Sequence, residues 1–150
     1  MMGTHVDGLD HAHVHVTDRA AAARWFGEVL GLRPAAGFGD WAKAPGGPLF
    51  LETQAGAHTL ALFEGAPVTG GDHTIAFRTD ASGFLRFLDG LASTDIRDRA
   101  GRRVTAADAV DHDLAWSVYF CDPDGNRFEL TTYEHEAVRA RLASVPGAGG

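Results

Sequence analysis

The sequence predicts an α+β fold built from two copies of a βαβββ unit. Residues 9–16 alternate polar and apolar side chains, which is typical of a strand with one buried face. A segment with helical spacing and two short apolar segments follow, and the same order repeats after Gly70 and Gly71. An Asp-His pair opens each half, at residues 10–11 and 72–73. The period is too long for a solenoid, so the repeat indicates a duplicated unit inside one domain.

The first strand carries three histidines on one face. In residues 9–16, the alternation places His11, His13 and His15 together and leaves small apolar side chains on the other side. Histidine is the commonest nitrogen ligand for metals, and it titrates near neutral pH. This strand is therefore the first candidate for a functional site.

A helix of about three turns is expected next, because apolar residues recur at helical spacing between a capping residue and a glycine. Asp18 provides the cap at its start, and Gly31 ends it. Residues 33–44 are only weakly patterned. Two further apolar segments are expected to form short strands, at 48–53 and 58–63.

The second half repeats this order. A strand is expected at 72–79 and a helix at 81–91, with Asp80 or Ser82 as its cap. Two strands follow a polar passage, at 115–121 and 127–133. The segment Asp122-Pro123-Asp124-Gly125-Asn126 joins them as a turn, because proline presets φ and glycine accepts a positive φ. A short helix is expected after Glu134 and a frayed tail at 145–150.

Composition excludes several classes of protein. The 150 residues include 13 Lys and Arg against 20 Asp and Glu, a net charge of −7, which argues against nucleic acid and anionic membranes as partners. No apolar run is long enough to span a bilayer, and the start of the chain does not resemble a secretory signal. A single cysteine fits a reducing compartment, so we expect a cytoplasmic protein.

The last two strands are expected to have one apolar and one polar face. Helices should cover the apolar face, which comprises Val118, Phe120, Phe128 and Leu130. The opposite face comprises Ser117, Tyr119, Arg127, Glu129, Thr131 and Tyr133. Together with the histidine face of the first strand, it suggests a polar chamber with a divalent metal. Two neutral imidazoles and one carboxylate form an open site of a known type, and we predict His11, His73 and Glu129 as its ligands.

Each of these residues also has an ordinary structural interpretation. A histidine on a strand is more often hydrogen-bonded at the surface or in the core than bound to a metal. Glu129 taken alone fits a solvated strand residue. The polar faces are also compatible with a dimer interface.

The paired segments LDHAHVHVTDRAAAARWFGEVLGL and DHTIAFRTDASGFLRFLDGL resemble the vicinal oxygen chelate superfamily. The resemblance covers about residues 7–135 and implies one domain with modules at about 7–66 and 70–135, followed by a short helix and tail at 136–150. The fold it implies is a curved mixed sheet around a metal site. The superfamily includes glyoxalase I, extradiol dioxygenases, fosfomycin-modifying enzymes and metal-free bleomycin-binding proteins, so it implies a fold more than an activity.

A sharper resemblance lies in VDHDLAWSVYFCDPDGNRFE, residues 110–129, which is similar to the signature of extradiol ring-cleaving dioxygenases. It implies iron ligation by His11, His73 and Glu129, and roles beside the iron for His112 and Tyr119. The family also has an acid/base histidine upstream of the second ligand. His58 occupies that position here.

The expected function is Fe(II)-dependent extradiol cleavage of a small catechol by O2, with Mn(II) as a second candidate metal. Small single-domain members resemble L-DOPA 2,3-dioxygenases, so L-DOPA is the expected substrate. Arg127 is expected to bind a substrate carboxylate, although a solvent-facing arginine explains it equally well. A homodimer is compatible with the sequence. His5 and His135 receive no role.

Two alternatives remain open at this point. One is a metal-dependent lyase or isomerase, or a transferase that modifies an antibiotic, which would keep the ligands without needing both His58 and Tyr119. Glyoxalase I usually has a ligand in the last strand of its first half, where this chain offers only Glu52 or Glu64 nearby. The other alternative is a drug-binding protein without catalysis, which would need neither metal nor His58.

Overall fold

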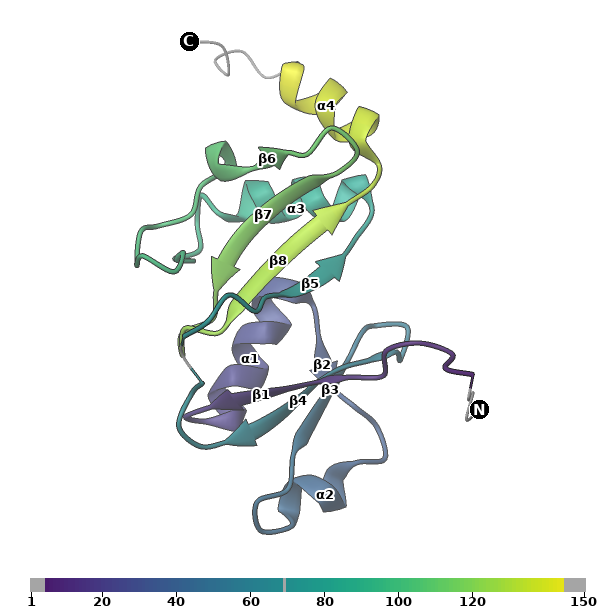
Figure 1. The fold of residues 1–150 in the computed structure, drawn as a ribbon, viewed down its shortest axis with the longest axis vertical. Coiled ribbons are helices and arrows are strands. Elements are labelled where there is room, and N and C mark those ends of the chain that lie inside the picture. Colours follow the sequence, from purple (N-terminus) through teal and green to yellow (C-terminus); the bar gives the residue numbers. More distant parts are fainter. Residues whose placement is uncertain (1–4, 69, 145–150) are drawn as a thin grey trace. The chain divides into compact units, whose positions relative to one another are not determined.

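The computed structural model describes residues 5–68 and 70–144 and divides into two compact units, 1–68 and 69–150 (Figure 1). We refer to them as unit 1 and unit 2, and each is defined by itself. The expected tail at 145–150 lies outside the described residues.

Unit 1 contains a four-stranded mixed sheet with the order β1-β4-β3-β2. Its elements are β1 (Ala12–Val16), α1 (Arg19–Leu30), β2 (Arg33–Pro34), α2 (Gly39–Lys43), β3 (Leu49–Glu52) and β4 (His58–Glu64). Strand β1 runs parallel to β4, whereas β3 runs antiparallel to both β4 and β2. Strand β1 is therefore an edge of this sheet, next to the strand that begins with His58.

Helix α1 begins and ends where the sequence predicts. The Asp18 side chain accepts a hydrogen bond from the Ala21 amide at 2.9 Å, and Gly31 ends the helix in the left-handed region with φ of 67°. Strand β1 begins later than expected. It starts at Ala12 rather than at Leu9, and the Leu9 side chain is 89% exposed.

Unit 2 repeats the arrangement, with a mixed sheet in the order β5-β8-β7-β6. Its elements are β5 (Ile75–Arg78), α3 (Ala81–Gly90), the 3₁₀ turn η1 (Ala106–Asp108), β6 (Val110–Asp111), β7 (Trp116–Cys121), β8 (Arg127–Thr132) and α4 (His135–Ala143). The first and last long strands of the unit, β5 and β8, pair in parallel, as β1 and β4 do in unit 1. The predicted α+β class and the duplicated unit are confirmed. Strand β5 is shorter than the expected 72–79, and Asp80 is the cap of α3.

The turn between β7 and β8 is built around the Asp122 carboxylate. It accepts hydrogen bonds from the Asp124 amide at 3.0 Å and from the Asn126 amide and side chain at 2.8 Å each. Gly125 has a φ of 86°, as the turn requires. Burial raises the pKa of Asp122, and these hydrogen bonds oppose that rise.

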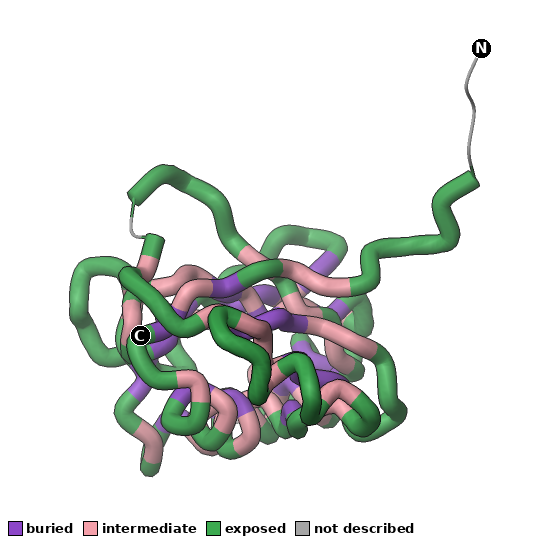
Figure 2. Tube along the Cα trace, turned by 90° about the horizontal axis from the view of Figure 1, so that it is seen from below, coloured by how far each residue is buried: buried purple, intermediate pink, exposed green. Residues whose placement is uncertain are grey.

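The two faces of β7 and β8 separate as predicted. The apolar face is buried, and it comprises Val118, Phe120, Phe128 and Leu130. Figure 2 shows the buried parts of the chain in purple. Helix α3 packs against β8 and contributes the buried Phe84 and Leu88. The polar face is left for other contacts. Within the described part of the chain, no helix combines the length and the hydropathy needed to cross a bilayer.

Candidate metal and catalytic site

The histidine face of β1 begins with His11, which lies directly before the strand. Its Nδ1–H donates a hydrogen bond of 2.6 Å to Oδ2 of Asp10. A carboxylate in this position fixes the ring and its tautomer, which leaves Nε2 as the unprotonated nitrogen, 3.2 Å from Nε2 of His13. His11 therefore has the arrangement of a metal-ligating imidazole.

Asp10 also contacts the predicted acid/base residue. Its Oδ1 lies 3.4 Å from Nδ1 of His58, the first residue of β4. Both imidazoles are about one-quarter exposed. The hydrogen bond from His11, assisted by His58, lowers the pKa of Asp10 and keeps it ionised. The Asp10 carboxylate therefore contacts both His11, which the sequence predicts as a metal ligand, and His58, which it predicts as an acid/base residue.

An aromatic wall of Phe38, Trp41 and Phe50 stands beside these histidines. The Phe50 ring lies 4.7 Å from the His11 ring, and the Phe38 ring lies 5.0 Å from the His58 ring, both centroid to centroid. Trp41 of α2 packs edge-on against Phe38 and is 53% exposed. This wall was not predicted, because residues 33–44 lack a clear pattern. The available signal was the pair Phe38 and Trp41, three residues apart in that segment.

In unit 2, Glu129 lies on the polar face of β8. The Ser117 hydroxyl donates a 2.6 Å hydrogen bond to its Oε1, and Tyr119 sits opposite it in the β7–β8 register. The Tyr119 hydroxyl is 3.1 Å from Nε2 of His112. Partial burial and the negative charge of Glu129 raise the pKa of Tyr119. The structure therefore brings together three predicted site residues of unit 2, which are His112, Tyr119 and Glu129.

His73 precedes β5 and lies in the loop that Gly70 and Gly71 begin. Gly71 has a φ of 77°, and a Cβ added there would come within 3.2 Å of the His73 Nδ1. A larger residue at this position would press on the His73 ring.

Arg127 lies on the same face of β8 as Glu129 and pairs with an acid. Its Nη1 is 3.2 Å from Oδ1 of Asp72, the neighbour of His73. Arg99 approaches the same oxygen at 3.8 Å. The predicted contact of Arg127 with a substrate carboxylate stays a prediction.

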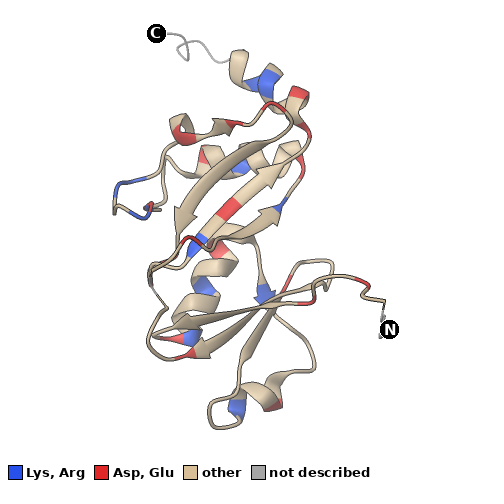
Figure 3. Ribbon diagram, viewed as in Figure 1, with Lys and Arg blue, Asp and Glu red and all other residues tan. Residues whose placement is uncertain are grey.

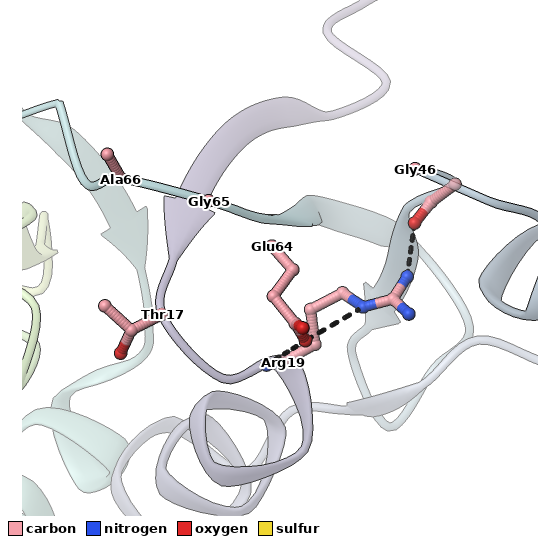
Figure 4. Close-up of a pocket in the computed structure, with 7 residues that line it drawn as sticks. Thr17, Arg19, Gly46, Glu64, Gly65 and Ala66 are labelled. Atoms are coloured by element: carbon pink, nitrogen blue, oxygen red, sulfur yellow. Dashed lines mark hydrogen bonds and ion pairs between the residues drawn. The ribbon is translucent and has the colours of Figure 1, made fainter.

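The two carboxylates considered for the end of the first half are held by arginines. Glu52 is buried and accepts a 3.0 Å hydrogen bond from Arg33. Glu64 pairs with Arg19 at 3.7 Å and lines a pocket of about 570 Å³ (Figure 4). The rest of the lining is Thr17, Arg19, Gly46, Gly47, Gly65 and Ala66, and it includes none of the predicted site residues.

Basic residues gather in the loop that follows α3 (Figure 3). Two of these arginines pair with acids of the same segment, whereas Arg99 approaches Asp72. Arg97 pairs with Asp95 at 3.0 Å, and Arg102 pairs with Asp108 at 2.9 Å. These contacts brace the loop.

His135, to which the sequence analysis gave no role, is anchored. Its Nε2 donates a 2.6 Å hydrogen bond to Oδ1 of Asp111, and its ring stacks on Trp116. This contact ties the start of α4 to β6.

The donor types fit a divalent transition metal, because imidazole nitrogen and carboxylate oxygen suit Fe(II) and Mn(II). His11 belongs to unit 1, whereas His73 and Glu129 belong to unit 2. In residues 5–68 and 70–144, no group of three or more potential ligands is assembled. The shared ligation of one ion by these three residues stays a prediction.

The comparison with protein families decides the family. A model of the Glyoxalase/Bleomycin resistance protein/Dioxygenase superfamily matches residues 8–130. The chain belongs to this superfamily. No curated protein matches it.

Several solved structures share the fold. FosX from Listeria monocytogenes, a fosfomycin resistance protein in complex with Mn(II) and sulfate, is 17% identical with a TM-score of 0.60, over 92% of this chain and 99% of that chain. The oxidase ChaP-H1 is 26% identical with a TM-score of 0.55, over 85% and 96% of the two chains. An integron cassette protein from the mobile metagenome of the Halifax Harbour sewage outfall is 21% identical with a TM-score of 0.62, over 85% and 99%.

Proposed function

We propose that this superfamily member is an Fe(II)-dependent extradiol dioxygenase that opens the ring of a small catechol. The observation that carries the proposal is the Asp10 carboxylate, which contacts both His11, the predicted ligand, and His58, the predicted base. A binding protein has no need for such a pair. The 26% identity to the oxidase ChaP-H1 also supports an oxidation as the reaction.

The iron would bind the two catechol oxygens, lower the pKa of their hydroxyls and bring O2 next to the ring. His11, His73 and Glu129 would hold it. With two neutral imidazoles and one carboxylate, the site would carry about one positive charge, which matches a catecholate monoanion. Mn(II) is the second candidate, since the same donors suit it.

We propose that His58 moves the second proton. Asp10 contacts its Nδ1, so Nε2 is the atom that would accept the proton from the remaining hydroxyl and later return it. The aromatic wall beside His58 offers ring faces to a flat substrate.

Tyr119 and His112 form a hydrogen-bonded pair, and Tyr119 lies opposite Glu129. From this position both side chains would form hydrogen bonds with oxygens of the substrate. Both atoms of O2 enter the product, which is a ring-opened carboxylate with an aldehyde or ketone group. L-DOPA is the proposed catechol, with Arg127 as the group that binds its carboxylate.

The test is anaerobic loading with Fe(II), followed by mixing with air and a series of catechols that includes L-DOPA. Ring opening produces a yellow semialdehyde, measured by visible absorbance and mass. Binding of metal without turnover of any catechol would overturn the dioxygenase proposal and favour a lyase, isomerase or transferase.

The variant His58→Phe distinguishes a role of His58 as a base from a role as a metal ligand. Phenylalanine in place of His58 keeps the ring contacts with Phe38 and Phe50 but removes the base. We expect turnover to fall about 10²- to 10⁴-fold with the iron content unchanged. Loss of iron in this variant would make His58 a ligand instead.

A further inference from the structure

Helix α2 carries part of the aromatic wall, but its own residues hold it only weakly. It has five residues, its cap Phe38 makes no side-chain hydrogen bond, and none of its residues is buried. A helix of this length is not stable in water by itself. Contacts with the rest of unit 1 must therefore fix the segment 35–48, which connects β2 to β3 and contains α2.

Arg19, the first residue of α1, provides such contacts. Its Nη2 donates a 3.0 Å hydrogen bond to the carbonyl oxygen of Ala42, and its Nη1 donates one to the carbonyl oxygen of Gly47. The last carbonyls of a helix have no partner within the helix, and a cation there also meets the negative end of the helix dipole. The forked guanidinium thus bonds both the last turn of α2 and the loop behind it.

Glu64, the last residue of β4, holds Arg19 from the other side. Its Oε2 accepts a 3.3 Å hydrogen bond from the Arg19 amide and lies 3.7 Å from the Arg19 Nε (Figure 4). The Arg19 side chain is 24% exposed, so water screens these contacts less than it does at an open surface. Arg19 therefore ties the end of β4 and the start of α1 to α2.

The position of α2 determines where the aromatic wall stands. The Phe38 ring stacks on the Phe50 ring at 5.0 Å, and the Trp41 ring meets Phe50 edge-on at 5.6 Å, both centroid to centroid. Phe50 is buried in β3 and is fixed by the sheet, whereas Phe38 and Trp41 depend on α2. The loop behind α2 fits closely, because a Cβ added at Gly47 would collide with the carbonyl oxygen of Trp41.

We propose that Arg19 is a positioning residue for substrate binding, because it holds Phe38 and Trp41 beside His58. The inference rests on the proposed function in one respect, which is that a flat aromatic ring binds against the aromatic wall. Arg19 acts through α2 and needs no contact of its own with the substrate. A wall that binds the ring equally in the ground state and in the transition state lowers KM without changing kcat.

The first experiment measures the opening of α2 in the full chain without substrate. Lys43 of α2 is the chain's only lysine and its side chain is 82% exposed, so a lysine-specific protease has one cleavage site. Cleavage within a helix requires local unfolding, and its rate follows the population of the open form. We expect Arg19→Gln to accelerate this cleavage at least about tenfold, because two hydrogen bonds from a charged group are lost.

Two further variants guard against a general loss of stability. Arg24→Gln is the matched control, because Arg24 is an exposed arginine of the same helix, and its cleavage rate should equal that of the wild type. Arg19→Lys keeps the charge beside Glu64 but lacks the fork, so we expect a smaller acceleration than in Arg19→Gln. A wild-type rate in both Arg19 variants, or an equal acceleration in Arg24→Gln, would overturn the proposal.

The second experiment adds catechol to the iron-free protein and measures protection of Lys43 from the same protease. Cyclohexane-1,2-diol is the control ligand, because it has two hydroxyls but no aromatic face. We expect protection by catechol alone, and an about three- to tenfold higher concentration for half-protection in Arg19→Gln, since ring contacts with the wall are lost. Equal half-protection concentrations in Arg19→Gln and the wild type would contradict the role of Arg19 in binding.

Kinetics of the Fe(II) form separates this inference from the proposed function. We expect Arg19→Gln to raise the KM for catechol by the same about three- to tenfold factor and to leave kcat unchanged. A fall in kcat at constant KM would mean a loss of folded enzyme and would overturn the positioning role. Absence of turnover in the wild type would overturn the dioxygenase proposal, whereas the cleavage rates at Lys43 would still test Arg19.

Discussion

At the scale of single residues, Asp10 sets the geometry of the unit 1 site. It is 68% exposed, yet both of its oxygens contact imidazoles. Its negative charge would make the His11 ring a stronger donor to a metal in the proposed site, and its hydrogen bond selects the tautomer. The effect of Asp10 on metal affinity can therefore be measured separately from turnover.

Replacing Asp10 with asparagine keeps the shape of the side chain but removes the charge. We expect the Kd for Mn²⁺ to rise about 10- to 100-fold, because the amide oxygen orients His11 less firmly and lowers its basicity. Calorimetry of the full chain measures this. Asp7→Asn, a change of charge three residues upstream, is the control, and an equal effect of both variants would reduce the role of Asp10 to general electrostatics.

Tyr119 is the residue of unit 2 whose hydroxyl can be removed cleanly. Tyr119→Phe takes away the group that bonds to His112 while keeping the ring, so we expect turnover to fall about 10²-fold with unchanged metal affinity. Steady-state oxygen uptake and metal titration measure the two effects. The chain's other tyrosine, Tyr133, is 67% exposed, and Tyr133→Phe should leave both quantities unaltered. A loss of metal in Tyr119→Phe would contradict the assignment.

At the scale of elements, period and capping chemistry predict most of the fold. Helix α1 was predictable because Asp18 and Gly31 act locally, and the β7–β8 turn because Gly125 accepts a positive φ. Helix α2 was missed, since it has five residues and no side-chain cap. Strand β1 begins at Ala12 because alternation reports a face and not the hydrogen bonds of a ladder, which start opposite Leu60.

In the candidate site, too, local sequence patterns predict some features and miss others. Alternation along single strands predicts which side chains share a face, so the grouping of His11 with His13 and of Glu129 with Tyr119 followed from the sequence. The contact of Asp10 with His58 depends on the parallel pairing of β1 with β4, which no local pattern encodes. The anchoring of His135 by Asp111 was missed for the same reason, because 24 residues separate them.

The link between α4 and β6 makes stability depend on pH. The hydrogen bond to Asp111, with help from Glu136, raises the pKa of His135, and burial opposes this. The same bond lowers the pKa of Asp111. A raised histidine pKa stabilises the fold below the unfolded value of about 6.5, and the contribution is lost as pH rises through the folded pKa.

We therefore expect His135→Gln to lower the Tm most near pH 6 and least near pH 9. Thermal unfolding of both proteins across this range measures the difference. The control is His5→Gln, since His5 is exposed in the segment before β1. A difference in Tm that does not change with pH would show that the stacking on Trp116, and not the charge, holds α4.

At the scale of the whole molecule, the two units repeat one strand order but carry different chemistry. Unit 1 holds the neighbouring His11 and His13 together with the Asp10–His58 contact, and unit 2 holds Glu129 opposite Tyr119. A single ion bound by His11, His73 and Glu129 would couple two units that otherwise each have their own sheet. Binding to the folded state alone stabilises every part that the ligand holds.

This coupling predicts how metal protects the chain from hydrogen exchange. Mn²⁺ should slow amide exchange in β1 of unit 1 and in β8 of unit 2 together. Glu129→Ala should remove the protection in β8 and reduce it in β1 as well, because the ion loses a ligand that only unit 2 supplies. Asp89→Ala changes an exposed acid on α3 and serves as the control. Full protection of β1 by metal in Glu129→Ala would mean that unit 1 binds its ion alone, without the shared triad.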